Sequence, residues 1–155
     1  MVDLRAIATG LGATDATTYI ASGNLICSIP GAALEFDTAL ERAIEARFGF
    51  FREVISRSLD EMRDALEAHP FPVLEPRFSS VTFLAAAPTA AAIERAAGYP
   101  TFDDEWRVIG SEQHVRYAGG AGSAQMSTAP IARALGVAGT ARNLLTVRKL
   151  IDLAS

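Results

Sequence analysis

The spacing of the apolar residues alternates along this chain between a helical period and short β-rich runs, and this alternation most restricts the fold. Apolar residues three and four positions apart predict helices over 3–11, 34–48, 59–68, 90–97 and 128–135, and a last helix after 140–143. Runs of β-forming residues predict strands within 17–28, 51–57, 80–87, 105–109 and 113–117. The chain is therefore expected to be a mixed α+β protein.

Turn residues interrupt two of the β-rich regions. Gly23 and Asn24 divide residues 17–28 into two runs, which indicates either a hairpin or one bulged strand. Gly110 and Ser111 separate the last two runs and are typical of a hairpin turn.

Prolines mark the best candidate for a boundary between two halves. The sequence His-Pro-Phe-Pro at 69–72 ends a predicted helix because each proline removes a backbone donor, and residues 69–79 are a candidate linker. The order helix–hairpin–helix recurs on both sides of this linker. This repeated order predicts duplicated ferredoxin-like halves of the βαββαβ type. The first half is expected to contain residues 1–72, and the second half is expected to contain residues 73–155 with a C-terminal helix. The two halves are expected to form one compact unit.

Composition restricts the class of protein and its compartment. The 155 residues are 50% hydrophobic and 21% charged, which is typical of a globular chain and not of a disordered one. The longest apolar runs are far too short for a membrane span, so no membrane association is expected. The N-terminus lacks the features of a secretory signal and Cys27 is the single cysteine, which together favour the cytoplasm.

Charge is distributed unevenly along the chain. The net charge of −4 argues against nucleic acid as the partner of the whole molecule, but residues 107–155 are basic and residues 1–106 are acidic. This asymmetry indicates either an anion-binding face or two halves that dock through opposite charges. Weak nucleic-acid binding through the basic C-terminal half is a further alternative.

Patterns for catalysis and for metal binding are absent from the sequence. His69 and His114 do not have the spacing of metal ligands and are interpreted as ordinary surface or cap residues, and Cys27 lies in an apolar strand. No nucleophile elbow of the Gly-x-Ser-x-Gly type occurs. The acidic run 103–105 is interpreted as solvated. We therefore predict no catalytic residue, no metal site and no cofactor.

A glycine-rich loop is the first candidate binding site. The loop residues Gly119, Gly120, Gly122 and Ser123 precede a predicted helix that Thr128 is expected to cap. Backbone N–H groups in such a loop and at a helix start can bind an anion, for example a phosphate. The alternative interpretation is a flexible turn without a ligand.

Several segments together resemble the bacterial domain-of-unknown-function family 1697. They are Thr-Tyr-Ile-Ala-Ser-Gly-Asn-Leu-Ile at 18–26, Arg-Phe-Gly-Phe at 47–50, Arg-Ser-Leu-Asp-Glu at 57–61, the His-Pro-Phe-Pro stop, and the ending Thr-Ala-Arg-Asn-x-x-Thr-Val-x-Lys-Leu at 140–150. The resemblance covers essentially the whole chain. It implies a cytoplasmic α+β protein with duplicated ferredoxin-like halves and implies no activity.

The resemblance also provides a second candidate site. Polar residues gather in two of its motifs, and we expect a face for a small polar ligand that is formed by Ser22, Gly23 and Asn24 with Arg142, Asn143 and Thr146. The alternative is that the two asparagines satisfy backbone groups of a turn and of a helix cap. The favoured function is thus an uncharacterised binding or interaction domain without established catalysis. The alternative is a binding protein or enzyme for a phosphate-bearing ligand.

One departure from the family concerns the sheet of the first half. Family members usually carry a strand ahead of the position of Met1, so the first half is expected to lack its first strand. The missing strand would leave an empty position in the sheet between 24–28 and 51–57. This position is filled by direct parallel pairing of the two segments, which the 34–48 helix connects, or by a strand from a neighbouring molecule in a homo-oligomer. A third alternative is that residues upstream of Met1 supply the strand. The first two solutions are favoured over an empty position.

Overall fold

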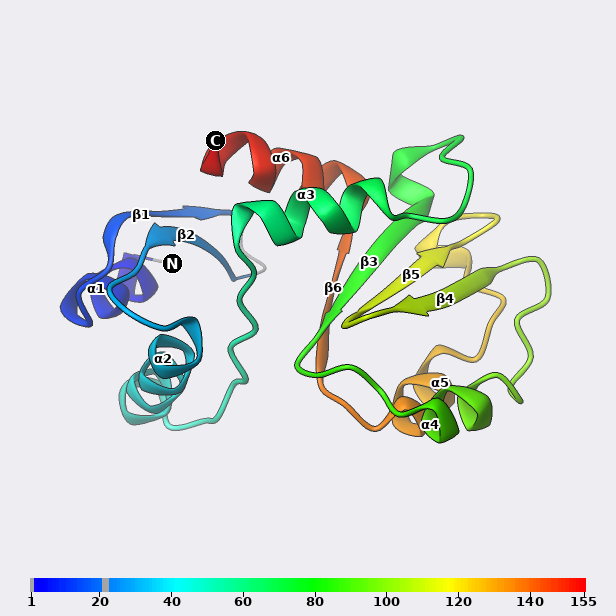
Figure 1. The fold of residues 1–155 in the computed structure, drawn as a ribbon, viewed down its shortest axis with the longest axis horizontal. Helices are drawn as coiled ribbons and strands as arrows, with labels where there is room; N and C mark the ends of the chain where they lie inside the picture. Colours follow the sequence, from blue (N-terminus) through cyan, green and yellow to red (C-terminus); the bar gives the residue numbers. More distant parts are fainter. Residues whose placement is uncertain (1, 21–22) are drawn as a thin grey trace. The chain divides into compact units, whose positions relative to one another are not determined.

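The computed structural model describes residues 2–20 and 23–155, and these form a mixed α+β protein with two antiparallel sheets, as predicted (Figure 1). The helices are α1 (Val2–Gly10), α2 (Ala33–Phe48), α3 (Leu59–Glu67), α4 (Ala90–Ala96), α5 (Thr128–Leu135) and α6 (Leu144–Ala154). The strands are β1 (Thr14–Tyr19), β2 (Asn24–Ser28), β3 (Ser79–Leu84), β4 (Glu105–Ile109), β5 (Glu112–Arg116) and β6 (Gly139–Asn143). Short 3₁₀ helices cover Pro76–Phe78 and Ala121–Ser123.

The chain divides into two compact units. Unit 1 contains the residues up to Ser58 together with Leu150–Ser155, and unit 2 contains Leu59–Lys149. The division by packing therefore lies before α3, whereas the sequence predicts a boundary at residue 72. The His-Pro-Phe-Pro segment at 69–72 does not act as an exposed linker, because Phe71 is buried and His69 contacts His114 of β5.

In unit 1, β1 and β2 form an antiparallel hairpin that packs with α1 and α2. The register runs from Tyr19↔Asn24 to Thr14↔Ser28 with a bulge in β1. The core cluster consists of small and large apolar side chains from both helices and the α1–β1 connection: Ala8, Ala13, Phe36 and Leu40. Helix α2 ends as predicted at Gly49, which has φ +78° and donates its N–H to the carbonyl of Glu45.

The prediction of a strand over 51–57 is wrong. This segment follows α2 without strand pairing, and side chains of α2 accept its hydrogen bonds. The backbone N of Val54 donates to Glu41 Oε1 at 2.9 Å, and Ser56 Oγ donates to Asp37 Oδ2 at 2.6 Å. The carboxylate of Glu41 thus accepts a backbone N–H that a neighbouring strand would otherwise bind, and Asp37 holds the segment through the Ser56 hydroxyl.

The prediction of direct pairing between 24–28 and 51–57 is wrong for the same reason. Within the described ranges the strand paired with β2 is β1, which forms a two-stranded sheet with it. Insertion of a strand from a neighbouring molecule stays a prediction.

Unit 2 contains the element order β3-α4-β4-β5-α5-β6 around a four-stranded antiparallel sheet with strand order β4-β5-β3-β6. The sequence analysis missed β6 and treated its residues as the approach to the last helix. With β6 the unit has the complete βαββαβ order. That both units repeat one ferredoxin-like half stays a prediction.

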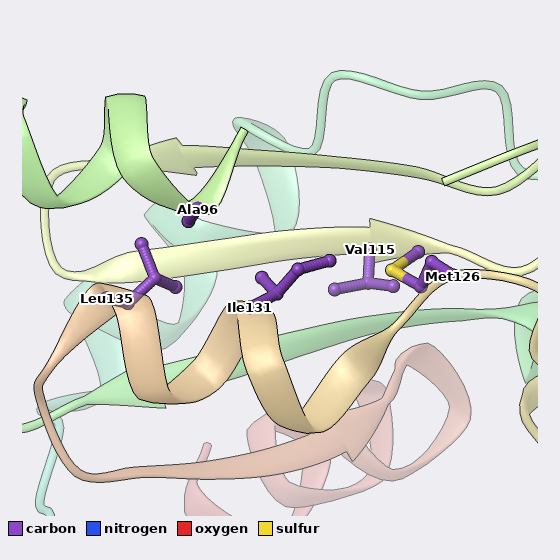
Figure 2. Close-up of a cluster of buried hydrophobic side chains, with 5 residues drawn as sticks. All are labelled: Ala96, Val115, Met126, Ile131 and Leu135. Carbon is purple, nitrogen blue, oxygen red and sulfur yellow. The ribbon is translucent and has the colours of Figure 1, made fainter. Parts of the chain in front are cut away.

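Helices α4 and α5 cover one face of this sheet. The core cluster there consists of Ala96, Val115, Met126, Ile131 and Leu135 (Figure 2). Trp106 and Val108 pack against this cluster. Side chains alternate between the faces of a strand, so His114 and Val81 point to the opposite face. The segment after α3 lies against that face through His69. No helix in the described ranges is long and apolar enough to cross a membrane.

Candidate anion-binding groove

A shallow, open groove lies between α4 and α5 on the surface of unit 2. Its lining combines the end of α4, the residues that follow it and the exposed side of α5: Arg95, Gly98, Tyr99, Pro130, Arg133 and Ala134. The lining contains two guanidinium groups and one phenol, and it contains no carboxylate.

The helical period places the arginine of α4 at the groove. Thr89 caps α4 by accepting a hydrogen bond from the N–H of Ala92 at 3.1 Å. The buried face of this short helix carries Ala92 and Ala96. Arg95 therefore lies on the exposed face.

The helical period also places Arg133 of α5 at the groove. Ile131 and Leu135 are the buried residues of α5, so Arg133 between them is exposed. Gly136 ends the helix with φ +71°, as predicted. The expectation that Thr128 caps α5 is wrong, because Thr128 is its first residue and Ser127 occupies the cap position without a side-chain hydrogen bond.

Some arginines of the described chain form ion pairs, whereas the two groove arginines, like Arg5 and Arg148, do not. Arg116 pairs with Glu105 at 2.7 Å and Arg47 pairs with Asp3 at 3.3 Å. No carboxylate in residues 2–20 and 23–155 forms an ion pair with Arg95 or Arg133. Two unpaired guanidinium groups beside one groove can bind a phosphate or a carboxylate through parallel N–H···O hydrogen bonds.

The predicted glycine-rich loop lies elsewhere in unit 2, next to a carboxylate of the protein itself. Asp104 Oδ1 accepts from the N–H of Ala118 at 2.8 Å, and Oδ2 accepts from Gln125 at 2.6 Å and Met126 at 2.9 Å. Asp104 is 2% exposed, so the interpretation of 103–105 as solvated acids is wrong for this residue. The amides that flank the loop thus already hold an anion.

One side of the glycine-rich loop packs against Phe78. Gly120 has φ +89°, and a Cβ atom there would lie 3.0 Å from Cε1 of Phe78. Residues Ala121–Ser123 form a 3₁₀ turn. Binding of an external anion by Gly119, Gly120, Gly122 and Ser123 stays a prediction.

The asparagines of the second candidate site satisfy local backbone groups. Asn24 Nδ2 donates to the carbonyl of Tyr19 at 3.0 Å across the hairpin. Asn143 Oδ1 accepts from the N–H of Thr146 at 2.9 Å in the first turn of α6. The structure thus gives each asparagine the local role that the sequence analysis named as the alternative.

The remaining residues of this site fall into separate parts of the chain. Ser22 lies outside the described residues, and Gly23 belongs to unit 1 with φ +83°. Arg142 belongs to unit 2, where its Nη1 donates to Thr140 Oγ1 at 2.7 Å and to the carbonyl of Ala141 at 2.8 Å. Burial lowers the pKa of Arg142. A ligand face shared by the two motifs stays a prediction.

A pair of histidines is a feature that the sequence analysis missed. His114 is 1% exposed, and its Nδ1 lies 3.0 Å from Nδ1 of His69. The interpretation of both histidines as ordinary surface or cap residues is wrong for His114. Their positions in the sequence are far apart, so no spacing rule could have indicated the pair.

A family model described as "Protein of unknown function (DUF1697)" matches residues 1–113. No curated protein and no solved structure matches the chain. The comparison therefore agrees with the resemblance in the sequence and adds no activity.

Proposed function

The chain belongs to the DUF1697 family, whose function is unknown, and we propose on the geometry of unit 2 that it is a binding protein for a small phosphate-bearing ligand. The observation that carries the proposal is the groove between α4 and α5, where Arg95 and Arg133 have no carboxylate partner among the described residues. The single cysteine supports a cytoplasmic location as part of the same proposal.

The chemistry of the lining favours an anion with several oxygen atoms. Each guanidinium group offers a planar set of N–H donors that matches two oxygen atoms of a phosphate. The residue Tyr99 is 41% exposed, and its hydroxyl group adds one donor at the same groove. Because the groove is open to solvent, salt screens these charges and the affinity falls as the ionic strength rises.

Titration with inorganic pyrophosphate tests the proposal. Isothermal titration calorimetry at low salt is expected to detect binding to the parent protein, and thermal unfolding is expected to shift upward with added pyrophosphate because the ligand binds the folded state. In the double variant Arg95→Ala/Arg133→Ala we expect the heat and the shift to be lost.

A matched control variant removes two positive charges at exposed arginines that do not line the groove. Arg5 in α1 and Arg148 in α6 are exposed, so Arg5→Ala/Arg148→Ala changes the net charge equally. The control is expected to bind pyrophosphate as the parent does. Equal binding by both double variants, or no binding by the parent, would contradict the proposal.

A further inference from the structure

The histidine pair of unit 2 joins two segments that are distant in sequence. His69 follows α3, and His114 lies in β5 on the face of the sheet that α4 and α5 do not cover. The Nδ1 atoms are 3.0 Å apart, and the ring centroids are 5.2 Å apart with an angle of 59° between the planes. The ring of Phe71 meets His69 edge-on at 5.7 Å. The 3.0 Å separation of the two Nδ1 atoms is that of a direct hydrogen bond between the imidazoles.

A hydrogen bond between two Nδ1 atoms fixes the protons of both rings. One neutral imidazole must carry its proton on Nδ1 and donate, and the other must carry its proton on Nε2 and accept. The Nε2 atoms of His69 and His114 are both buried and have no hydrogen-bond partner in the described part of the chain. Such buried groups without partners are rare in folded proteins, and each requires a physical explanation.

The two imidazoles are better suited to share a proton than to bind a metal ion. Histidines that bind a metal usually donate their other ring N–H to an acceptor, which neither Nε2 atom here has. Within residues 2–20 and 23–155 no group of three or more histidine, cysteine or acidic residues surrounds the pair.

Charged groups of both signs share the sheet face of His114, because Glu112 and Arg116 lie two residues to either side of it in β5. On β4, Arg107 is the register partner of His114, and its Cζ lies 5.8 Å from the ring of Phe71. On β3 the register partner of His114 is Val81, and on β6 the partner of Val81 is Arg142. No carboxylate of the described residues is paired with either imidazole. Burial, and secondarily the charge of His69, lower the pKa of His114 from 6.5 to about 4, and burial lowers the pKa of His69.

We propose that the His69–His114 pair is an acid-sensitive latch that holds residues 69–72 against the sheet of unit 2. Two neutral imidazoles share the Nδ1–H···Nδ1 hydrogen bond and keep Phe71 buried. When acid adds a proton to each ring, both Nδ1 atoms become donors, the hydrogen bond is lost and two positive charges face each other beside Arg107. Release of the segment then exposes Phe71 and His114, which are both buried in the latched form.

A fluorescent reporter at Phe71 tests the release. In the variant Phe71→Trp/Trp106→Phe the only tryptophan lies on the latch, because Trp106 is the single tryptophan of the chain. Because release requires a proton on both rings and the pKa of His114 is about 4, we expect the emission to shift to longer wavelength reversibly as the pH falls to about 4, while the far-ultraviolet circular dichroism stays constant. A variant with His69→Gln added is expected to lack this pH-dependent shift.

Proton-detected nitrogen spectra of the unmodified protein give a second measurement that does not depend on any variant. At neutral pH we expect one imidazole protonated on Nδ1 and one protonated on Nε2, and titration midpoints below 6.5 for both. The proposal is overturned if both rings carry the Nε2 proton, if both titrate near 6.5, or if the reporter responds only when the circular dichroism signal is lost.

Discussion

Substitution of Asp104 is expected to produce the largest single loss of stability in unit 2. The carboxylate is 2% exposed and accepts hydrogen bonds from the backbone N–H groups of Ala118, Gln125 and Met126. It therefore connects the start of β4 to both ends of the glycine-rich loop. In Asp104→Ala all three N–H groups lose their acceptor.

The magnitude follows from the burial of the three donors. A buried N–H group without a partner costs about 1–3 kcal/mol. The bond to Met126 is fully buried and the other two are partly buried, so water can replace some of what is lost at Ala118 and Gln125. We expect Asp104→Ala to lower the free energy of unfolding by about 3–5 kcal/mol, which is a large part of the roughly 5–15 kcal/mol that stabilises a typical domain.

The isosteric variant Asp104→Asn separates hydrogen bonding from packing. Its amide oxygen can take the place of Oδ2 and keep the bonds to Gln125 and Met126, while its amide N–H₂ faces the N–H of Ala118. We expect a loss of about 1–3 kcal/mol, because one bond is replaced by two opposing donors and the charge is removed.

Urea unfolding followed by the fluorescence of Trp106 measures both losses, because this tryptophan lies in unit 2. Asp103→Ala is the matched control. Asp103 is exposed and forms hydrogen bonds through its backbone atoms, so the free energy of unfolding of Asp103→Ala is expected to stay within about 0.5 kcal/mol of the parent. If Asp104→Ala unfolds at the same urea concentration as Asp103→Ala, the carboxylate does not hold the loop and the reasoning fails.

Two further substitutions test local features of the fold. Ser58 directly precedes α3 and starts the sequence Ser-Leu-Asp-Glu, so Ser58→Ala is expected to lower the free energy of unfolding by about 0.5–2 kcal/mol through loss of a helix cap, and an unchanged thermal midpoint would refute this. Gly139 in β6 lies close to β3, and an added Cβ would be 2.8 Å from Cγ2 of Thr82 and 2.9 Å from Cδ2 of Leu84. Gly139→Ala is therefore expected to destabilise the sheet by about 1–3 kcal/mol in urea unfolding, whereas Gly122→Ala, where a Cβ meets nothing within 4 Å, serves as the control.

Local patterns were sufficient for the elements whose structure depends on nearby residues. The apolar stripe over 34–48 predicted α2 to within one residue, since the period of the helix and the glycine that ends it are both local signals. The hairpin at Gly110 followed from turn chemistry in the same way, and the hairpin at Gly23 was one of the two structures that the turn residues indicated.

Elements that depend on distant partners could not be predicted from local patterns. The sequence Gly-Thr-Ala-Arg-Asn of β6 has no alternation of apolar residues, and it is a strand because it pairs with β3. Conversely, residues 51–57 have the composition of a strand, but Asp37 and Glu41 of α2 bind this segment.

The candidate site was hidden from sequence analysis for the same physical reason. The groove exists because α4 and α5 bring Arg95 and Arg133 to one surface, and neither helix contains a motif for anion binding. The burial of Asp104 also depends on amides that follow it well along the chain. Such sites are set by tertiary packing, which a periodic pattern does not encode.

The strand order of unit 2 has a consequence for how the protein is made. β3 is a central strand, yet both of its neighbours, β5 and β6, are synthesised after it, and β6 follows only after two helices and two strands have left the ribosome. During translation β3 must therefore wait with both edges unpaired, and its apolar residues Val81, Phe83 and Leu84 are exposed to aggregation in that interval. Chains stalled before residue 139 would accumulate as targets for chaperones, whereas chains that extend past β6 can close the sheet.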